Sequence, residues 1–275
     1  RLTGRESELV LHGGGNTSVK ATVRNLLGED QEVLYIKGSG WDLGAIEPQG
    51  FPALDLAYLR KLRRLETLSD EEMVNQFRTH LLDAASPNPS IETLVHAFLP
   101  PKFIDHTHAD AVVTLTHQPG AEDLLREALG PKIAILPFIM PGFPLAQAMA
   151  DLYEQQPEVE CLVLLHHGLF TFGEDARTAY DRMIEYVSRA EDFLARAGRQ
   201  ARPPAGQAAP SLEPTTVLPL LRGTLCRGGE EGEQKNFLLS WRRSPEILAA
   251  LDRADAEELL VSGVLTPDHV IRTKN

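Results

Sequence analysis

Cysteine is scarce in this 275-residue chain, which holds only Cys161 and Cys226. Two cysteines cannot form the framework of a small disulfide-stabilised secreted domain, and their scarcity favours a protein of the reducing cytoplasm. Cys161 lies within an apolar run, so we expect it to pack as a small hydrophobic side chain.

Positive charge is also in short supply. The chain has 27 lysines and arginines against 39 aspartates and glutamates, for a formal net charge of -12. Nucleic acids and anionic membrane surfaces both require a basic face, so we expect neither as a main partner. A phosphate-bearing ligand would therefore need a local group of donors to attract it.

Long apolar runs are missing as well. No stretch approaches the roughly 18–20 residues of a membrane span, and the chain does not open with the basic and apolar segments of a secretory signal. Because it begins at Arg1 and not at Met, we expect its natural start to lie upstream. A hydrophobic content of 43% with 24% charged residues is ordinary for a globular enzyme. A length of 275 residues suits one large domain, or one domain with an appendage.

Two histidines one residue apart, His106 and His108, form the most informative pattern. We expect a strand here that continues over residues 111–115, and alternate side chains of a strand point to the same face. Neutral imidazole nitrogen is a preferred zinc ligand. The pair therefore indicates half of a zinc site, although such pairs also occur on exposed strand ends that bind nothing.

A second histidine pair follows a different strand. The continuous apolar run over residues 159–165 predicts a strand covered on both faces, and it leads directly to His166, His167 and a glycine. A catalytic zinc site has three protein ligands and one open position. One of His166 and His167 is therefore expected to supply the third ligand.

A carboxylate precedes the first histidine pair. Ser90 is placed to cap a helix over residues 91–99, and Glu92 lies in its first turn, close in sequence to the histidine strand. Glu92 is a candidate general acid and base. The alternative is that it merely complements the helix dipole.

Two glycine-rich turns flank predicted strands. Residues 12–18 precede a strand over 19–24, and residues 37–41 follow a strand over 33–36. Glycine lets backbone N–H groups approach an anion, so two such turns at one end of adjacent strands could form one anion cradle. The alternative is that they are plain turns. Neither turn is a P-loop or a dinucleotide-binding fingerprint. We expect Lys37 to be a solvated or phosphate-facing charge and not a Schiff-base lysine.

The remaining patterns organise the chain. Helices are predicted over residues 56–65, 70–84, 145–153 and 176–197, and a strand over 132–137. Residues 201–214 are rich in Pro, Ala and Gly and predict a flexible linker. Beyond it we expect strands over 217–221 and 237–241, a charged loop over 228–233, and helices over 245–254 and 255–262.

Five motifs follow one another along the chain: Gly15-Asn16-Thr17-Ser18, Lys37-Gly38-Ser39-Gly40, Ser90-Ile91-Glu92, His106-Thr107-His108 and His167-Gly168. They stand in the same order in the class II aldolase/adducin family, which the chain resembles over roughly residues 13–198. The resemblance implies a three-layer α/β/α sandwich around a mostly antiparallel sheet. It also implies a homotetramer with active sites between subunits.

The resemblance also implies roles for single residues. His106, His108 and His167 resemble the zinc ligands, Glu92 the catalytic acid and base, and His96 a histidine that follows one turn later. The residues similar to the family's phosphate contacts are Asn16, Ser39, Gly40 and Ser90. The reaction implied is the reversible retro-aldol cleavage of a ketose 1-phosphate, in which zinc acts as a Lewis acid and no Schiff base is needed.

Residues 263–274 resemble the region after the aldolase part of bifunctional rhamnulose-1-phosphate aldolase/lactaldehyde dehydrogenases. We therefore expect a rhamnulose-1-phosphate-like substrate, cleaved to dihydroxyacetone phosphate and a hydroxyaldehyde such as lactaldehyde. Residues 1–200 would form the catalytic domain, and residues 201–275 a linker and C-terminal extension that leads toward a dehydrogenase domain absent from this sequence. The alternatives are a zinc-dependent epimerase or dehydratase of the same fold, a non-catalytic adducin-like module, and a purely structural zinc site, which usually has four protein ligands.

Overall fold

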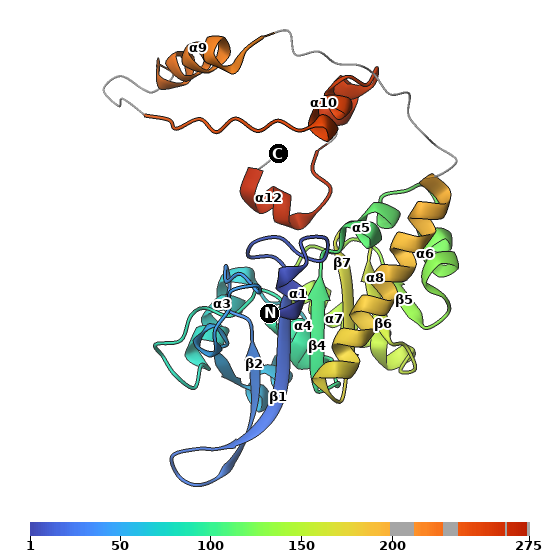
Figure 1. Cartoon of the computed structure of the whole chain (residues 1–275). Helices are drawn as coiled ribbons and strands as arrows, with labels where there is room; N and C mark the ends of the chain where they lie inside the picture. The colour runs from blue at the N-terminus through green and yellow to red at the C-terminus, as the bar shows by residue number, and fades with distance from the viewer. Residues whose placement is uncertain (199–211, 228–235, 262, 274–275) are drawn as a thin grey trace. The chain divides into compact units, whose positions relative to one another are not determined.

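The computed structural model describes residues 1–198, 212–227, 236–261 and 263–273. The chain divides into two compact units, the first made of residues 1–199 and 264–275 and the second of residues 200–263. The first unit is therefore built from two separate parts of the sequence. The ribbon in Figure 1 is coloured along the chain and shows the elements of each unit.

A seven-stranded sheet organises the first unit. In space its strands follow the order β3-β2-β1-β4-β7-β6-β5, and every neighbouring pair is antiparallel except β5 and β6. The strands are β1 (Asn16–Arg24), β2 (Asp30–Ile36), β3 (Ala53–Asp55), β4 (Phe103–Thr107), β5 (Ile133–Leu136), β6 (Cys161–Leu164) and β7 (Gly168–Gly173). The predicted mostly antiparallel sheet is confirmed.

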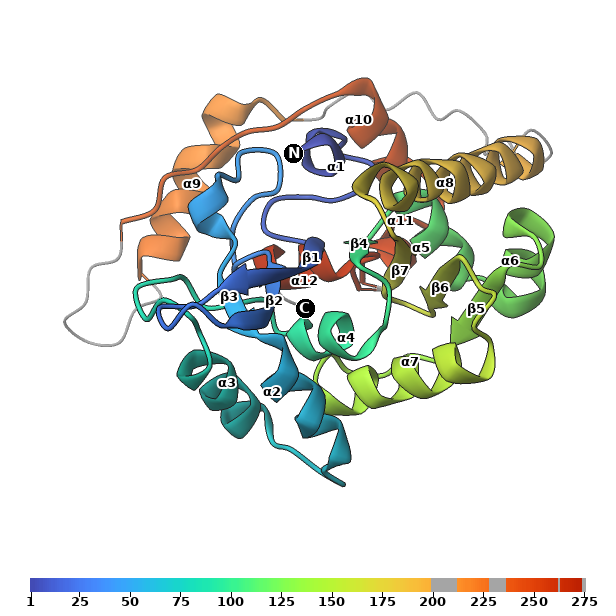
Figure 2. The ribbon, with the colours of Figure 1, turned by 90° about the horizontal axis from the view of Figure 1, so that it is seen from below.

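Helices cover both faces of this sheet, as the end-on view in Figure 2 shows. On one face lie α2 (Leu56–Lys61), α3 (Asp70–Thr79), α4 (Thr93–Phe98) and α7 (Phe143–Gln155), whose apolar side chains form one buried cluster with the sheet. On the other face a second cluster includes α5 (Asp110–Thr116), α6 (Ala121–Leu129) and α8 (Ala176–Gly198). The three-layer α/β/α sandwich is thus the observed architecture.

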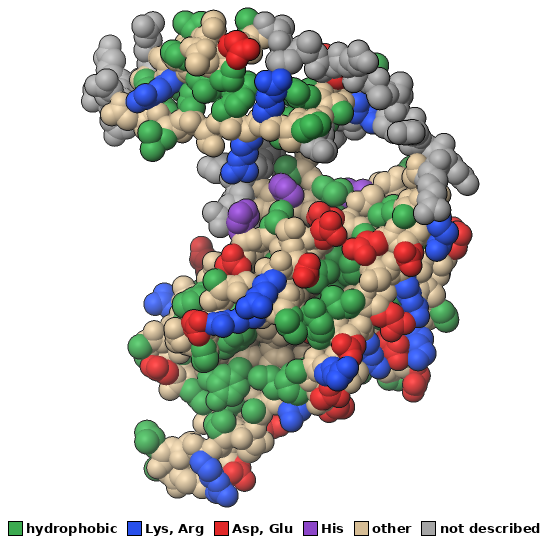
Figure 3. Space-filling view, viewed as in Figure 1, with side chains coloured by type: hydrophobic (Ala, Val, Ile, Leu, Met, Phe, Trp, Pro, Cys, Tyr) green, Lys and Arg blue, Asp and Glu red, His purple; other side chains and the backbone are tan. Residues whose placement is uncertain are grey.

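Local sequence signals explain how several helices begin and which side they bury. The Ser69 hydroxyl accepts a hydrogen bond from the Glu72 backbone N–H, which caps α3 and turns Met73 and Phe77 into the core. In α8, Ala179, Met183 and other residues at helical spacing are buried. On its outer side, charged side chains of both signs are interspersed (Figure 3).

Four short elements complete the first unit. They are α1 (Leu2–Arg5), two single 3₁₀ turns (Pro48–Gly50 and Leu62–Arg64), and α12 (Pro267–Thr273) near the end of the chain. Within the residues that the structure describes, no helix is long and apolar enough to cross a membrane.

The strand predicted over residues 111–115 is wrong, because these residues lie in α5. The strand β4 ends at Thr107, and the backbone N–H of Asp110 then donates to the Glu8 carbonyl oxygen and not to a strand. The apolar residues Val112, Val113 and Leu115 are buried. A short β-branched run fits either structure, and here tertiary packing decides in favour of the helix.

In the second unit, the strands predicted over residues 217–221 and 237–241 are also wrong. The first segment lies in α9 (Pro214–Arg227), and the second has no regular structure. A strand needs a hydrogen-bonded neighbour, and the described residues of this unit contain no strand. The two predicted helices are present as α10 (Pro245–Leu251) and α11 (Ala256–Val261). The predicted linker falls mostly, and the charged loop over 228–233 entirely, outside the described residues.

Candidate active site

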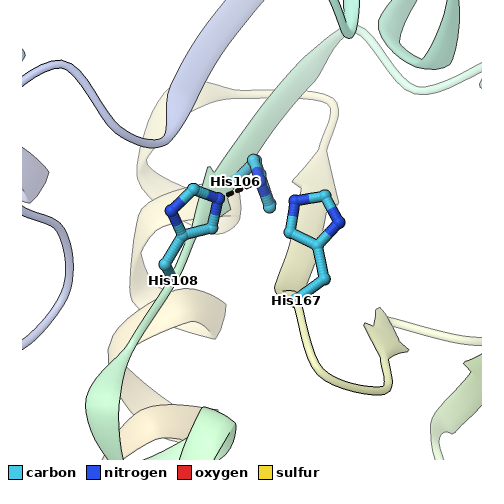
Figure 4. Close-up of side chains that lie close together, drawn as sticks. All are labelled: His106, His108 and His167. Carbon is cyan, nitrogen blue, oxygen red and sulfur yellow. Dashed lines mark hydrogen bonds between the residues drawn. The ribbon is translucent and has the colours of Figure 1, made fainter. Parts of the chain in front are cut away.

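Three histidines converge where β4 and β7 meet. His106 lies near the end of β4, His108 lies just past it, and His167 lies in the turn between β6 and β7. Since β4 and β7 are antiparallel neighbours, that turn comes back beside the end of β4. Each histidine offers one ring nitrogen, and the three nitrogens lie within 4.8 Å of one another (Figure 4).

Steric crowding explains why a glycine follows His167. A Cβ atom at position 168 would overlap the carbonyl oxygen of Thr107, so only glycine allows the two strands to approach this closely. His166 is exposed instead, with a φ of 60° and its ring centroid 4.4 Å from that of His117. The spacing left open whether His166 or His167 joins His106 and His108. In the structure it is His167 that lies beside them.

The hydrogen bonds of two rings show that the cluster suits a cation. The Nδ1–H of His106 donates to the Leu169 carbonyl oxygen and that of His108 to a carboxylate oxygen of Asp268, each at 3.0 Å. A neutral imidazole carries a single N–H, so both Nε2 atoms present lone pairs. These two Nε2 atoms lie 3.0 Å apart (dashed line in Figure 4), and their facing lone pairs repel unless a cation lies between them.

Burial favours the neutral forms of His106 and His167. Burial lowers the pKa of His106 well below its ordinary value, and the neighbouring His108 adds to the effect. Burial likewise lowers the pKa of His167 to about 3, although the nearby carboxylate of Glu92 opposes it. Neutral imidazole is the form that binds a metal ion, so the donor set fits one.

Glu92 faces the same cluster. Its side chain is buried, with Oε2 3.3 Å from Nε2 of His106 and Oε1 3.3 Å from Nε2 of His167. The Asn16 amide donates to Oε2 at 2.7 Å, whereas Oε1 has no hydrogen-bond partner among the described residues. A buried carboxylate oxygen without a partner is costly, and a metal ion or a substrate proton would satisfy it.

Asn16 and His96 hold Glu92 in place. The Nε2–H of the fully buried His96 donates to the Asn16 side-chain oxygen at 2.5 Å, while its Nδ1 accepts from the Ser18 hydroxyl at 2.7 Å. The Asn16 amide donates to both Glu92 and the Ser90 hydroxyl, the latter at 3.2 Å. Asn16 was predicted as a phosphate contact, but both of its amide hydrogens already form hydrogen bonds, to Glu92 and Ser90. Both ring nitrogens of His96 also form hydrogen bonds, to Asn16 and Ser18.

A cavity of about 320 Å³ opens in front of these groups. It brings together all of the sequence-predicted site residues except His106, which is fully buried and does not line the cavity. The lining includes Asn16, Ser39, Gly40, Ser90, Glu92, His108 and His167, together with Lys37, Pro267 and Asp268.

The two glycine-rich turns lie side by side in this cavity. A Cβ atom on Gly13 would lie 3.2 Å from the Gly40 carbonyl oxygen, and the Lys37 ammonium donates to the Gly13 carbonyl oxygen at 2.7 Å. Lys37 is only 2% exposed, which excludes the solvated alternative for this side chain. Burial lowers the pKa of Lys37 to about 8, while Glu92 and Asp268 counteract the shift.

Asp268 is a site residue that the sequence analysis did not find. It comes from the C-terminal part of the first unit, where it is 4% exposed and bonds His108. Burial acts to raise the pKa of this carboxyl, but the hydrogen bonds from His108 and from the Leu11 backbone outweigh it, so the net shift is downward. No local pattern links Asp268 to His108, which precedes it by 160 residues.

The family comparison agrees with the fold and the site. Residues 1–194 match the family described as class II aldolase and adducin N-terminal domain, and residues 213–275 match the second domain of class II aldolases. The chain therefore belongs to the class II aldolase and adducin family.

Individual relatives extend this result. The chain is 31% identical over 280 residues to a Bacillus subtilis protein named uncharacterized oxidoreductase YuxG, covering 99% of this chain but only 40% of that relative. The N-terminal class II aldolase domain of a conserved Thermoplasma acidophilum protein is 41% identical, with a TM-score of 0.67 over 70% of this chain and 89% of that chain. A sugar-phosphate aldolase from Thermotoga maritima, 20% identical with a TM-score of 0.52 over 75% and 99% of the two chains, shows a similar fold.

Proposed function

We propose that this protein is a zinc-dependent aldolase that reversibly cleaves a ketose 1-phosphate. The expected substrate resembles rhamnulose 1-phosphate, and the expected products are dihydroxyacetone phosphate and a hydroxyaldehyde such as lactaldehyde. The observation that carries the proposal is the Oε1 atom of Glu92, which has no hydrogen-bond partner among the described residues. It lies 3.3 Å from Nε2 of His167, beside a cluster of three buried histidines.

His106, His108 and His167 would hold the metal ion. When bound, such an ion acts as a Lewis acid that polarises the substrate's carbonyl and hydroxyl oxygens. Three protein ligands leave a position for substrate, as in catalytic zinc sites, whereas structural sites usually have four protein ligands.

Glu92 would move the proton. Cleavage breaks the C3–C4 bond of the ketose, the C4 hydroxyl loses its proton as the aldehyde forms, and C3 gains a proton. Asn16 fixes the Oε2 atom of Glu92, so Oε1 is the atom left to exchange a proton with substrate. The His96–Asn16–Glu92 chain of hydrogen bonds holds the carboxylate in one orientation, which lowers the entropic cost of that transfer.

The glycine-rich side of the cavity would bind the phosphate. The hydroxyls of Ser39 and Ser90 and the backbone at Gly40 offer donors, and the Lys37 ammonium adds positive charge to this otherwise acidic chain. Asn16 would join them only by releasing one of its present hydrogen bonds.

The larger context completes the proposal. We propose residues 1–200 as the catalytic domain, residues 201–275 as a linker and C-terminal extension, and a cytoplasmic homotetramer with sites between subunits. The chain spans about 40% of the length of the curated relative it matches, so only the aldolase step is proposed for these residues.

A direct assay tests the proposal. Purified protein should contain about one zinc ion per chain and release dihydroxyacetone phosphate from rhamnulose 1-phosphate, measured with a coupled reductase. Product analysis separates the rivals, because an epimerase gives an isomeric sugar phosphate and a dehydratase gives a product that has lost water. Intact substrate after incubation of the zinc-loaded protein with a panel of ketose 1-phosphates would refute aldolase activity and favour a non-catalytic module.

A further inference from the structure

The carboxylate of Asp268 reaches the histidine cluster from the far end of the sequence. Its Oδ1 accepts the Nδ1–H of His108 at 3.0 Å, and its Oδ2 accepts the Leu11 backbone N–H at 3.2 Å. Both carboxylate oxygens are therefore used, one on the histidine and one on the glycine-rich turn region. The contact is buried, since the side chains of His108 and Asp268 are 6% and 2% exposed.

The fit around Asp268 is close. A Cβ atom on Gly14 would overlap the Asp268 carboxylate, so the glycine turn leaves room for this side chain only because position 14 carries none. Thr266, two residues earlier, is also buried, and its carbonyl oxygen accepts the His269 backbone N–H in the first turn of α12. The segment is thus seated in the first unit at several points.

The three histidines differ in how their outer nitrogens are held. Nδ1 of His106 donates to a backbone carbonyl, and Nδ1 of His167 has no hydrogen-bond partner among the described residues. His108 alone of the three binds a side-chain carboxylate there. Such a carboxylate fixes the tautomer and the ring orientation and makes the opposite nitrogen a better metal ligand.

We propose that Asp268 is a positioning residue that holds His108 with its Nε2 directed into the metal site. This inference rests on the proposed metal-dependent function and adds to it a requirement for the C-terminal segment. The site is then built from two parts of the chain, and residues 1–200 alone lack one of its supports.

Asp268→Asn tests the proposal with little change in shape. His108 and Leu11 donate to two different oxygens of Asp268, and asparagine has an NH₂ group in place of one of them, so that one of the two donors would face a donor. Metal affinity should fall about 10- to 100-fold, as is typical when such a partner is lost. Zinc affinity is measured by competition with a chromogenic chelator, and the d–d absorption of the cobalt-substituted protein should report a changed ligand geometry.

Two controls separate positioning from other effects. Asp110→Asn removes one negative charge from an exposed carboxylate near enough to Asp268 for their charges to repel, so it tests the charge alone. Val270→Ala truncates a half-exposed side chain of α12 and tests the segment's general stability. Both control variants should keep wild-type zinc affinity.

Gly14→Ala is a second test variant, beside Asp268→Asn. It should displace the Asp268 carboxylate without altering His108 and should also weaken zinc binding.

The outcomes distinguish the two proposals. If the wild-type protein binds no divalent metal, the proposed function fails. If the wild type binds zinc and Asp268→Asn binds it equally tightly while folded, the positioning role fails. If Asp268→Asn and Gly14→Ala both fail to fold, ¹⁵N spectra of the histidine-labelled wild-type zinc protein test the tautomer of His108 directly. His108 protonated at Nδ1 is the expected tautomer, and His108 protonated at Nε2 would overturn the inference.

Discussion

Replacement of Glu92 by glutamine separates a catalytic carboxylate from one that merely begins a helix. The glutamine side chain has nearly the same shape, and its oxygen would still accept the 2.7 Å hydrogen bond from Asn16. Its amide would then occupy the place of Oε1, 3.3 Å from Nε2 of His167, where it can no longer accept a proton. The substitution thus removes basicity and leaves the packing intact.

The expected magnitude follows from the role. A positioned general acid–base group contributes about 10²–10⁴-fold, so kcat should fall by that factor, equivalent to about 3–5 kcal/mol in the activation barrier. If Glu92 only complements the dipole of α4, its loss costs about 0.3–1 kcal/mol of stability and leaves turnover close to normal. The two effects appear in different measurements.

The assay compares kcat for dihydroxyacetone phosphate release, zinc content and melting temperature. Glu71→Gln is a matched control, because Glu71 is an exposed carboxylate in the first turn of α3 and does not line the cavity. It should show a small loss of stability and unchanged turnover. A zinc-loaded, folded Glu92→Gln protein with near-wild-type kcat would refute the catalytic role of Glu92. His96 is not a ready substitute as the general base, because both of its ring nitrogens already form hydrogen bonds.

Three further predictions concern other parts of the first unit. His167→Ala should empty the zinc site while His166→Ala leaves it filled, as metal analysis after dialysis would show, and equal occupancy in the two variants would contradict the assignment. Ser39→Ala should raise KM for the phosphorylated ketose several-fold more than for its unphosphorylated analogue, and equal effects would mean that the turn binds no phosphate. Burial lowers the pKa of Lys20 to about 7 from its ordinary 10.5, so between these values the unfolded chain binds more protons and stability rises with pH. The part of the rise from pH 7 to 9 that comes from Lys20 should be about 2 kcal/mol in urea unfolding, and the curve of Lys20→Met should be less steep by that amount, the remaining rise including that of Lys37; parallel curves would exclude Lys20 as a source.

Sequence patterns predicted the central features because those features have local causes. His106 lies in the expected strand and His108 directly after its end, close to His106 as the spacing predicted, and the glycine turns precede and follow strands that pair in the sheet. The assignment of His167 needed the resemblance, and its physical reason, the lack of room for a Cβ at Gly168, is visible only when the two strands are together.

Other features depend on partners that a single stretch of sequence does not show. Residues 111–115 have strand-like composition but pack as α5. Residues 217–221 lie in α9, and the described part of their unit offers no strand to pair with. Asp268 lies 160 residues from His108, and nothing in its neighbours marks it as a partner of a histidine. Its contact arises only from the tertiary fold.

The division of the first unit between two parts of the sequence has a consequence for its synthesis. The sheet and α8 are complete when residue 198 leaves the ribosome, but Asp268 follows 70 positions later. At about 5–20 residues per second, a growing chain would spend about 4–14 s with its sheet formed and His108 unsupported. Zinc binding should then be tightest once Asp268 has reached His108, so a nascent chain arrested near residue 200 should lose zinc to a chelator that the protein with residues 1–275 resists.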